Sequence, residues 1–162
     1  MGIRNANSSA NDDTLLPYMW LNEGRSALVT IKGFAELYLD DKIGDLNSTQ
    51  RATMQKIDDC TKDVIEKWNE FQSFFRIGFQ YNQSLSADAL SLDNVLFLQE
   101  NIINRALSSL MTIKEQIEHL LKDTVEDISG EDQEALDAMY TSCLYAIERW
   151  NEPLQYFKKS RE

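Results

Sequence analysis

Apolar residues recur along most of the chain at steps of three, four and seven, which is the spacing of helices that bury one face. The first stripe predicts a helix that ends near Lys42, and its members are Leu21, Leu28, Ile31, Ala35 and Tyr38. Asn47, with Gln50 three residues later, is typical of a helix start. A second helix should therefore run from there to about Phe75, on a stripe of Ile57, Cys60, Val64, Trp68, Phe71 and Phe75.

The second half of the chain is organised in the same way. A third helix is predicted from between Ser91 and Asp93 to about Val125, with Ile103, Leu110, Ile113, Ile117 and Leu120 on its apolar side. A fourth should begin at Ser129 or Gly130, with Leu136, Met139, Cys143, Ala146, Trp150 and Phe157 as its stripe. Pro153 should bend or loosen the last turns of this helix, because proline removes a backbone hydrogen bond.

The two halves are diverged copies of one sequence. Residues 21–75 align with 103–157 at a constant offset of 82, without a gap and with 16 identities in 55 positions. The blocks Thr-Ile-Lys (from Thr30 and Thr112) and Trp-Asn-Glu (from Trp68 and Trp150) carry most of the specificity. A lone helical hairpin leaves one apolar face bare, and two related hairpins can bury those faces against each other.

The predicted fold is therefore all-α: an antiparallel four-helix bundle made of two tandem helical hairpins, with an approximate internal twofold axis. The hairpins should pack within one chain or be swapped between two chains. The domain is divided into a flexible tail, a first hairpin, a connector and a second hairpin, over residues 1–12, 13–75, 76–91 and 92–158.

Composition narrows the possible functions. The formal net charge of −11 argues against nucleic acid or an anionic membrane surface as a partner, because phosphate binding needs clustered lysine and arginine. No stretch reaches the roughly 18 apolar residues of a bilayer span, and the first residues lack the apolar core of a signal peptide. We expect a cytoplasmic protein whose two cysteines, Cys60 and Cys143, are buried free thiols.

The first hairpin resembles a known signalling domain. Residues 22–37 read NEGRSALVTIKGFAEL, which is similar to the phosphoacceptor helix of sensor histidine kinases: His-Glu-Leu-Arg-Thr-Pro-Leu, two residues, then Ile-Lys-Gly-Tyr-Ala-Glu-Leu. Residues 68–78, WNEFQSFFRIG, stand where that family has Asp-Phe-Ser-Arg-Ile-Glu. The resemblance covers about 20–78, and extends to 103–157 through the internal repeat. It implies a histidine kinase dimerisation and phosphoacceptor (HisKA-like, DHp) fold, in which two hairpins form a four-helix bundle.

In that family the histidine receives phosphate from ATP and passes it to the aspartate of a receiver domain. Here Asn22 and Asn104 occupy the acceptor positions, and an amide has no nucleophilic imidazole nitrogen. The acid that assists proton transfer in the family is present as Glu23 but is replaced by Arg105 in the second copy. Ser26 stands where the family has the Thr or Asn that helps dephosphorylation. With no glycine-rich nucleotide loop in the sequence, we expect no cofactor and no ATP binding.

The resemblance implies a non-catalytic adaptor, a pseudokinase-like bundle that binds a response-regulator receiver or a sensor kinase. Val29, Gly33 and Phe34 fall off the buried stripe, and in the related family this region receives the first helix of the receiver. An exposed Phe34 would be such a contact, or it would pack under the 76–91 connector. The candidate partner-binding residues are Glu23, Ser26, Val29, Lys32, Gly33 and Phe34.

Other readings stay open. His119, the only histidine, lies 15 residues after Asn104, about 22 Å along the same predicted helix, and could act as a phosphotransferase acceptor. Glu23 and Ser26 could act as a phosphatase on a phosphorylated receiver, and an oligomerising scaffold is a third possibility. Glu115, Glu118 and His119 lack the spacing of a paired metal site, so we expect no bound metal. The acidic run 126–137 is either a solvated hairpin tip or a docking site for a basic partner.

Overall fold

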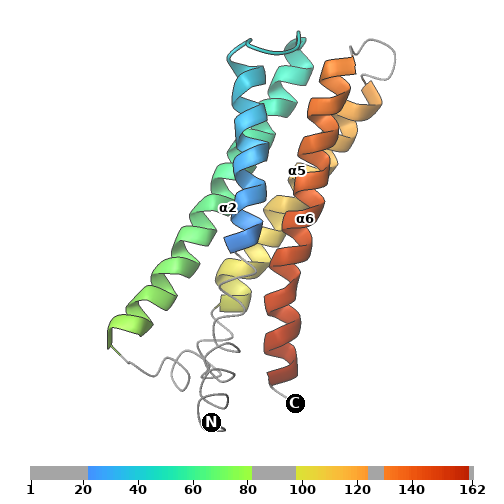
Figure 1. Ribbon diagram of the computed structural model, residues 1–162. Helices are drawn as coiled ribbons and strands as arrows, with labels where there is room; N and C mark the ends of the chain where they lie inside the picture. Colours follow the sequence, from blue (N-terminus) through green and yellow to red (C-terminus); the bar gives the residue numbers. More distant parts are fainter. Residues whose placement is uncertain (1–21, 82–97, 124–129, 161–162) are drawn as a thin grey trace, which may run out of the picture.

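The computed structural model describes residues 22–81, 98–123 and 130–160 (Figure 1). The expected tail over 1–12, the start of the first hairpin and the connector beyond residue 81 lie outside the described residues, as do residues 126–129 of the acidic run. In the described part of the chain the regular elements are helical, without a strand.

The first helix is described from residue 22 to residue 39, and we refer to it as helix 22–39. It is followed by α2 (Ser48–Tyr81), and then by a short π-helical segment, η1 (Leu98–Ile103), that continues directly into α5 (Asn104–Asp123). The last helix is α6 (Gly130–Ser160). None of the described helices has the length and hydropathy needed to cross a membrane.

The predicted start of the second helix is confirmed in atomic detail. The Gln50 side chain accepts a hydrogen bond from the Asn47 backbone N–H at 2.9 Å, and the Asn47 side chain accepts one from the Gln50 N–H at 2.8 Å. This reciprocal pair is a capping box, which satisfies backbone donors that the first turn of a helix leaves free.

Two predicted helix ends need correction. Helix 22–39 ends before Lys42, because the chain turns through Asp41 and Gly44, both in the left-handed region with φ of 59° and 66°. The second helix continues past Phe75 to Tyr81, so residues 76–81 are helical and not connector. No proline interrupts them, and a single mid-helix glycine costs only about 1 kcal/mol. The fourth helix contains Pro153 and continues to Ser160, and the bend or loosening of its last turns stays a prediction.

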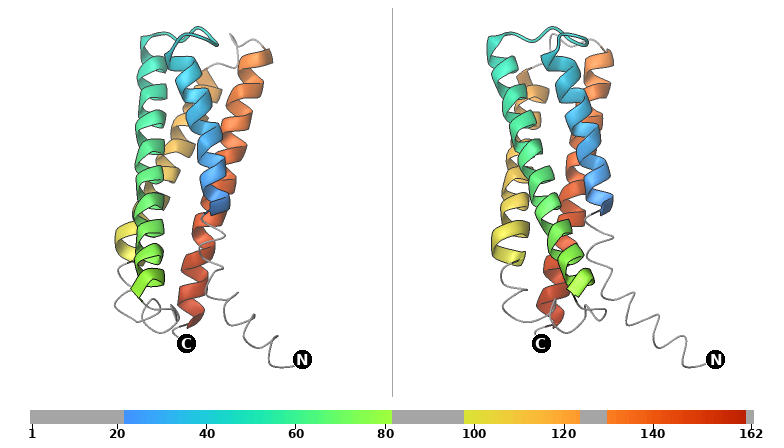
Figure 2. Two further views of the ribbon diagram at one scale, coloured as in Figure 1. Left: turned by 60° about the vertical axis from the view of Figure 1, so that its left-hand side comes forward. Right: turned by 90° about the vertical axis from the view of Figure 1, so that its left-hand side faces the viewer.

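The helices form a four-helix bundle, as predicted (Figure 2). Helix 22–39 lies between α2 and α6, and α5 packs against both α2 and α6 from the other side. The turn over residues 40–47 lies at the same end of the bundle as the last turn of α5 and the first turn of α6. Each hairpin therefore runs antiparallel, and the two hairpins point in the same direction.

The predicted stripes form one core. Of the stripe residues whose side chains are described, all but Cys60 are buried. Cys60 is half-buried, and the expectation of two buried thiols is wrong for this residue. The inner position belongs to its neighbour Thr61, which is fully buried and whose hydroxyl donates to the Ile57 carbonyl at 2.7 Å. Leu21, Phe75 and Phe157 lie outside the residues whose side chains are described.

Contacts repeat at the offset that the sequence repeat predicts. Lys32 pairs with Glu36 one turn later, and Lys114 pairs with Glu118 in the same way. Each copy buries its tryptophan, Trp68 or Trp150, near the end of the core. The ion pairs Lys67–Glu70 and Arg149–Glu152 also occupy matching positions. The duplication is thus preserved in the packing as well as in the sequence.

Candidate functional site: the outer face of helix 22–39

Four of the singled-out residues share the outward face of helix 22–39. Asn22, Ser26, Val29 and Gly33 follow one another at steps of four, three and four, so they form one stripe along the helix. All four are exposed, and the Val29 side chain is 57% accessible. A Cβ built on Gly33 would meet no atom within 4 Å, so the space beside it is open.

Leu37 continues this stripe by one more turn, and it is 37% accessible. Sequence reasoning missed it, although its spacing of four residues from Gly33 was a signal that could have found it. Phe34 differs from the expectation of an exposed contact, because it is half-buried and packs against the core. It lies on the helix between the core stripe and the outer stripe.

A shallow groove runs beside this stripe, between helix 22–39 and α6. Helix 22–39 contributes Glu23, Ser26, Ala27 and Thr30, and α6 contributes Thr141, Ser142 and Tyr145. Gly24 lets the two helices approach closely here, since a Cβ at this position would lie 3.3 Å from the Arg149 Cβ and from the Trp150 ring. Most of the lining surface is apolar, and the hydroxyl groups of Ser26, Thr30, Thr141, Ser142 and Tyr145 add uncharged hydrogen-bonding groups to it.

Glu23 is held at one end of the groove by two side chains from α6. The Tyr145 hydroxyl donates to Glu23 Oε2 at 3.3 Å, and Arg149 Nη1 lies 3.4 Å from the same oxygen. The Arg149 guanidinium also stacks over the Tyr145 ring, 5.0 Å from its centroid. Burial, reinforced by the Glu23 charge, raises the pKa of the Tyr145 hydroxyl, so this group remains a donor at neutral pH.

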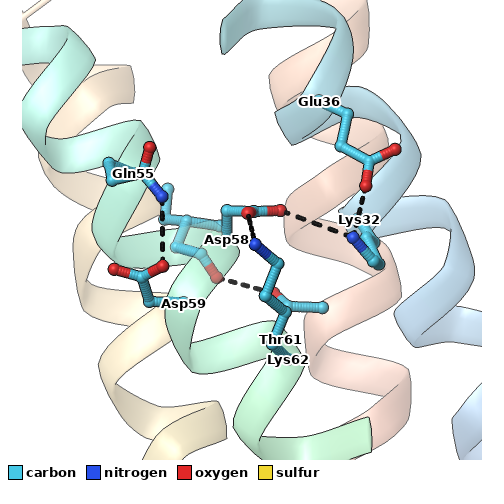
Figure 3. A network of polar contacts seen from close by, with 8 residues as sticks. Lys32, Glu36, Gln55, Asp58, Asp59, Thr61 and Lys62 are labelled. Atoms are coloured by element: carbon cyan, nitrogen blue, oxygen red, sulfur yellow. Dashed lines mark hydrogen bonds and ion pairs between the residues drawn. The ribbon is translucent and has the colours of Figure 1, made fainter.

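Lys32 points away from the groove, toward α2, where it takes part in a polar network (Figure 3). It pairs with Glu36, and its Nζ lies 4.0 Å from Asp58 Oδ1. Asp58 is only 3% exposed, and its other oxygen accepts from Lys62 Nζ at 2.9 Å. The hydrogen bond and charge of Asp58 raise the pKa of Lys62, while the bond and charge of Lys32 lower the pKa of Glu36. This network joins the two helices of the first hairpin.

The second hairpin has a related network with different chemistry. Glu118 accepts from Lys114 at 3.0 Å and from the Tyr140 hydroxyl at 3.2 Å. Tyr140 stands where the first copy has Asp58, so a neutral donor replaces the buried carboxylate. The hydrogen bond from Lys114 lowers the pKa of Glu118, and the bond from Tyr140 adds to this effect.

The two degenerate acceptor positions, Asn22 and Asn104, are both exposed near the start of equivalent described helices. His119 is exposed on α5, more than four turns beyond Asn104, with exposed Glu115 one turn before it. Within the described ranges 22–81, 98–123 and 130–160, no three acidic, histidine or cysteine side chains are grouped to hold a metal ion.

The groove could not be found from the sequence alone. Its α6 side depends on which way α6 faces helix 22–39, and Tyr145 and Arg149 are 122 and 126 residues away from Glu23. Searches for similar proteins give no guide to its role: no family model, no curated protein and no solved structure matches the chain.

Proposed function

We propose that this protein is a non-catalytic adaptor of two-component signalling, which binds a response-regulator receiver domain in the cytoplasm without transferring phosphate. The observation that carries the proposal is the outward stripe of helix 22–39. It combines Gly33, which matches the family pattern, and the exposed side chains of Ser26 and Val29 with an open groove, and it begins at Asn22, where the family has its histidine.

The chemistry of this stripe favours binding over catalysis. Asn22 offers an amide, which accepts and donates hydrogen bonds but does not form a phosphoramidate. Glu23 is bound by Tyr145 and Arg149, and with an amide at residue 22 its carboxylate has no imidazole proton to take. An exposed apolar side chain such as Val29, one turn from a glycine with open space beside it, is typical of a surface on which another helix packs.

The test is binding to purified receiver domains from the source organism, measured by pull-down and then by calorimetry. We expect at least one receiver to bind at micromolar concentration, and Val29→Glu to weaken it by about tenfold or more, because the charge would be desolvated at the contact. Leu144→Glu, on another exposed face of α6, is the matched control and should bind normally. Failure of every receiver to bind would contradict the proposal.

Enzymatic alternatives are decided by incubating the protein with a phosphorylated receiver. We expect no label on the chain and no faster loss of the aspartyl phosphate. Label that disappears in His119→Ala would show a phosphotransferase instead. Faster dephosphorylation that disappears in Glu23→Gln and Ser26→Ala would show a phosphatase. Light scattering that gives a higher oligomer in place of a monomer would favour a scaffold.

A further inference from the structure

The internal repeat gives the bundle a second surface that can be compared position by position with the first. On α5 the matching outward stripe is described and exposed throughout, and its residues are Asn104, Ser108, Met111, Glu115 and His119. Met111 matches Val29, and both are exposed apolar side chains, 43% and 57% accessible. The stripes thus start alike, with an amide, a serine and an apolar side chain.

The stripes then diverge toward their ends. Glu115 replaces Gly33, so a charged side chain fills the space that is open on the first copy. His119 replaces Leu37. The first stripe therefore carries five uncharged residues over about 22 Å of helix, in a chain of net charge −11, while the second ends in titratable groups. Packing a partner helix over Glu115 would desolvate a carboxylate, which is unfavourable unless the partner supplies a counter-charge.

The boundaries between neighbouring helices beside the two stripes, which we call seams, differ as well. In the first copy, Ala27 and Tyr145 line the open groove between helix 22–39 and α6. Their matching residues are Ser109 and Asp63, and Ser109 Oγ donates to Asp63 Oδ2 at 2.6 Å. This bond ties α5 to α2 across the seam where the first copy leaves room. At the edge of the seam Arg105 stands where the first copy has Glu23.

We propose that each bundle has one working docking face, on the first repeat, and binds a single partner helix there. This inference rests on the proposed function: the occupant is one amphipathic helix of a receiver domain. Its apolar stripe packs on Val29, Gly33 and Leu37, with a large side chain over Gly33. Lysine or arginine on its flanks faces the field of an acidic bundle, which would speed association.

The first test is stoichiometry with a receiver that binds. Calorimetry should give one receiver per chain, whereas two equal faces would give two. Val29→Glu should weaken binding by about tenfold or more, and Met111→Glu, the same change at the matching position, should leave it within about twofold. Both sites are exposed, and equal helical circular dichroism and melting temperatures of the two variants establish that neither result reflects unfolding.

A second test rebuilds the first face on the second copy. The variant Arg105→Glu, Ser109→Ala, Glu115→Ala and His119→Leu reverses the charge at residue 105 to match Glu23, removes the carboxylate at 115 and the imidazole at 119, and breaks the bond across the seam. The ratio should rise from one receiver per chain toward two. A ratio that stays at one would overturn the assignment of the asymmetry to these four positions.

Photocrosslinking reports the position of the contact directly. With p-benzoylphenylalanine in place of Val29 the receiver should be captured, and in place of Met111 it should not. Two receivers per wild-type chain, equal losses in the two glutamate variants, or equal capture from both positions would overturn the one-face inference while the proposed function stands. If no receiver binds, the proposed function fails, and the inference fails with it.

Discussion

The Tyr38 hydroxyl donates a hydrogen bond to Asp132 Oδ1 at 3.2 Å, and it also lies 3.4 Å from the Asp132 carbonyl oxygen. Tyr38 ends the core stripe of helix 22–39, and Asp132 lies in the first turn of α6, so this contact joins the two hairpins at the turn end of the bundle. Burial and the Asp132 carboxylate raise the pKa of Tyr38 far above its usual value, which keeps the donor protonated. Gly44 lies against the same ring, in the turn between helix 22–39 and α2.

Gly44→Ala should destabilise the protein by about 2 kcal/mol. The residue has φ of +66°, a conformation that costs alanine roughly 1 kcal/mol, and its Cβ would come 2.5 Å from Tyr38 Cε1. The ring cannot give way without breaking its bond to Asp132. The free energy of unfolding from urea titration, followed by circular dichroism, measures the effect.

Gly33→Ala is the matched control with the opposite sign. Gly33 lies inside helix 22–39 with open space beside it, so alanine should stabilise the protein by about 0.5 to 1 kcal/mol through helix propensity alone. If both alanines shifted the free energy of unfolding equally, the contact between the turn and Tyr38 would have no weight in stability.

Alkaline pH should destabilise the protein through Cys143. Burial raises the pKa of this thiol from 9.0 to about 12, so the folded state holds the proton more tightly than the unfolded state. Stability is unaffected below pH 9 and falls as pH rises from 9 toward 12, by about 1 kcal/mol between pH 9 and 10.

Cys143→Ser isolates this contribution, since serine can still donate to the Leu110 carbonyl, to which Sγ lies at 3.4 Å, but does not ionise in this range. Urea midpoints measured from pH 8 to 11 should decline less steeply in the variant than in the wild type. Parallel curves would mean that the thiol ionises as freely in the folded protein as in the unfolded chain.

The two cysteines should differ in reactivity. Cys60 is half-buried, with a pKa that burial raises, whereas Cys143 is fully buried inside the core. Titration with a disulfide reagent at pH 8 should modify one thiol slowly in the native protein and the second only after guanidinium is added. Cys60→Ser should abolish the native reaction, and a native protein that loses both thiols at one rate would contradict the burial of Cys143.

Local signals in the sequence sufficed for much of the fold. Asn47 and Gln50 specify a helix start through groups three residues apart, and the buried stripes are read from spacing alone. The exchange between Cys60 and Thr61 shows the limit of such reasoning. Hydrophobicity favours the thiol for the interior, but a threonine whose hydroxyl bonds to its own helix loses little on burial.

Only part of the candidate site could be predicted from the sequence, for a related reason. The outward stripe of helix 22–39 follows from its period, which gave Val29 and Gly33. Predicting the burial of Phe34 required the exact rotation of the helix against its neighbours. Adjacent residues differ by 100° around the helix axis, and this step separates half-buried Phe34 from exposed Gly33. Tyr145 and Arg149 required the register between helices from opposite ends of the chain, and no local signal carries that information.

Placing a histidine at the acceptor position tests the resemblance to histidine kinases directly. Asn22→His places an imidazole on an exposed position directly before Glu23, whereas Asn104→His places one before Arg105. A phosphorylated receiver that binds the first face should transfer its phosphoryl group from the aspartate to the new imidazole nitrogen of Asn22→His. The product is recognised as an acid-labile, alkali-stable label on the chain.

Asn104→His is the matched control and should stay unlabelled, because its neighbour is a cation and its face lacks the open groove. Adding Glu23→Gln to Asn22→His should slow the transfer, since the carboxylate that would orient the imidazole and take its proton is lost. Equal labelling of the two histidine variants would show that exposure alone decides acceptance, and that the first copy has no special relation to the receiver.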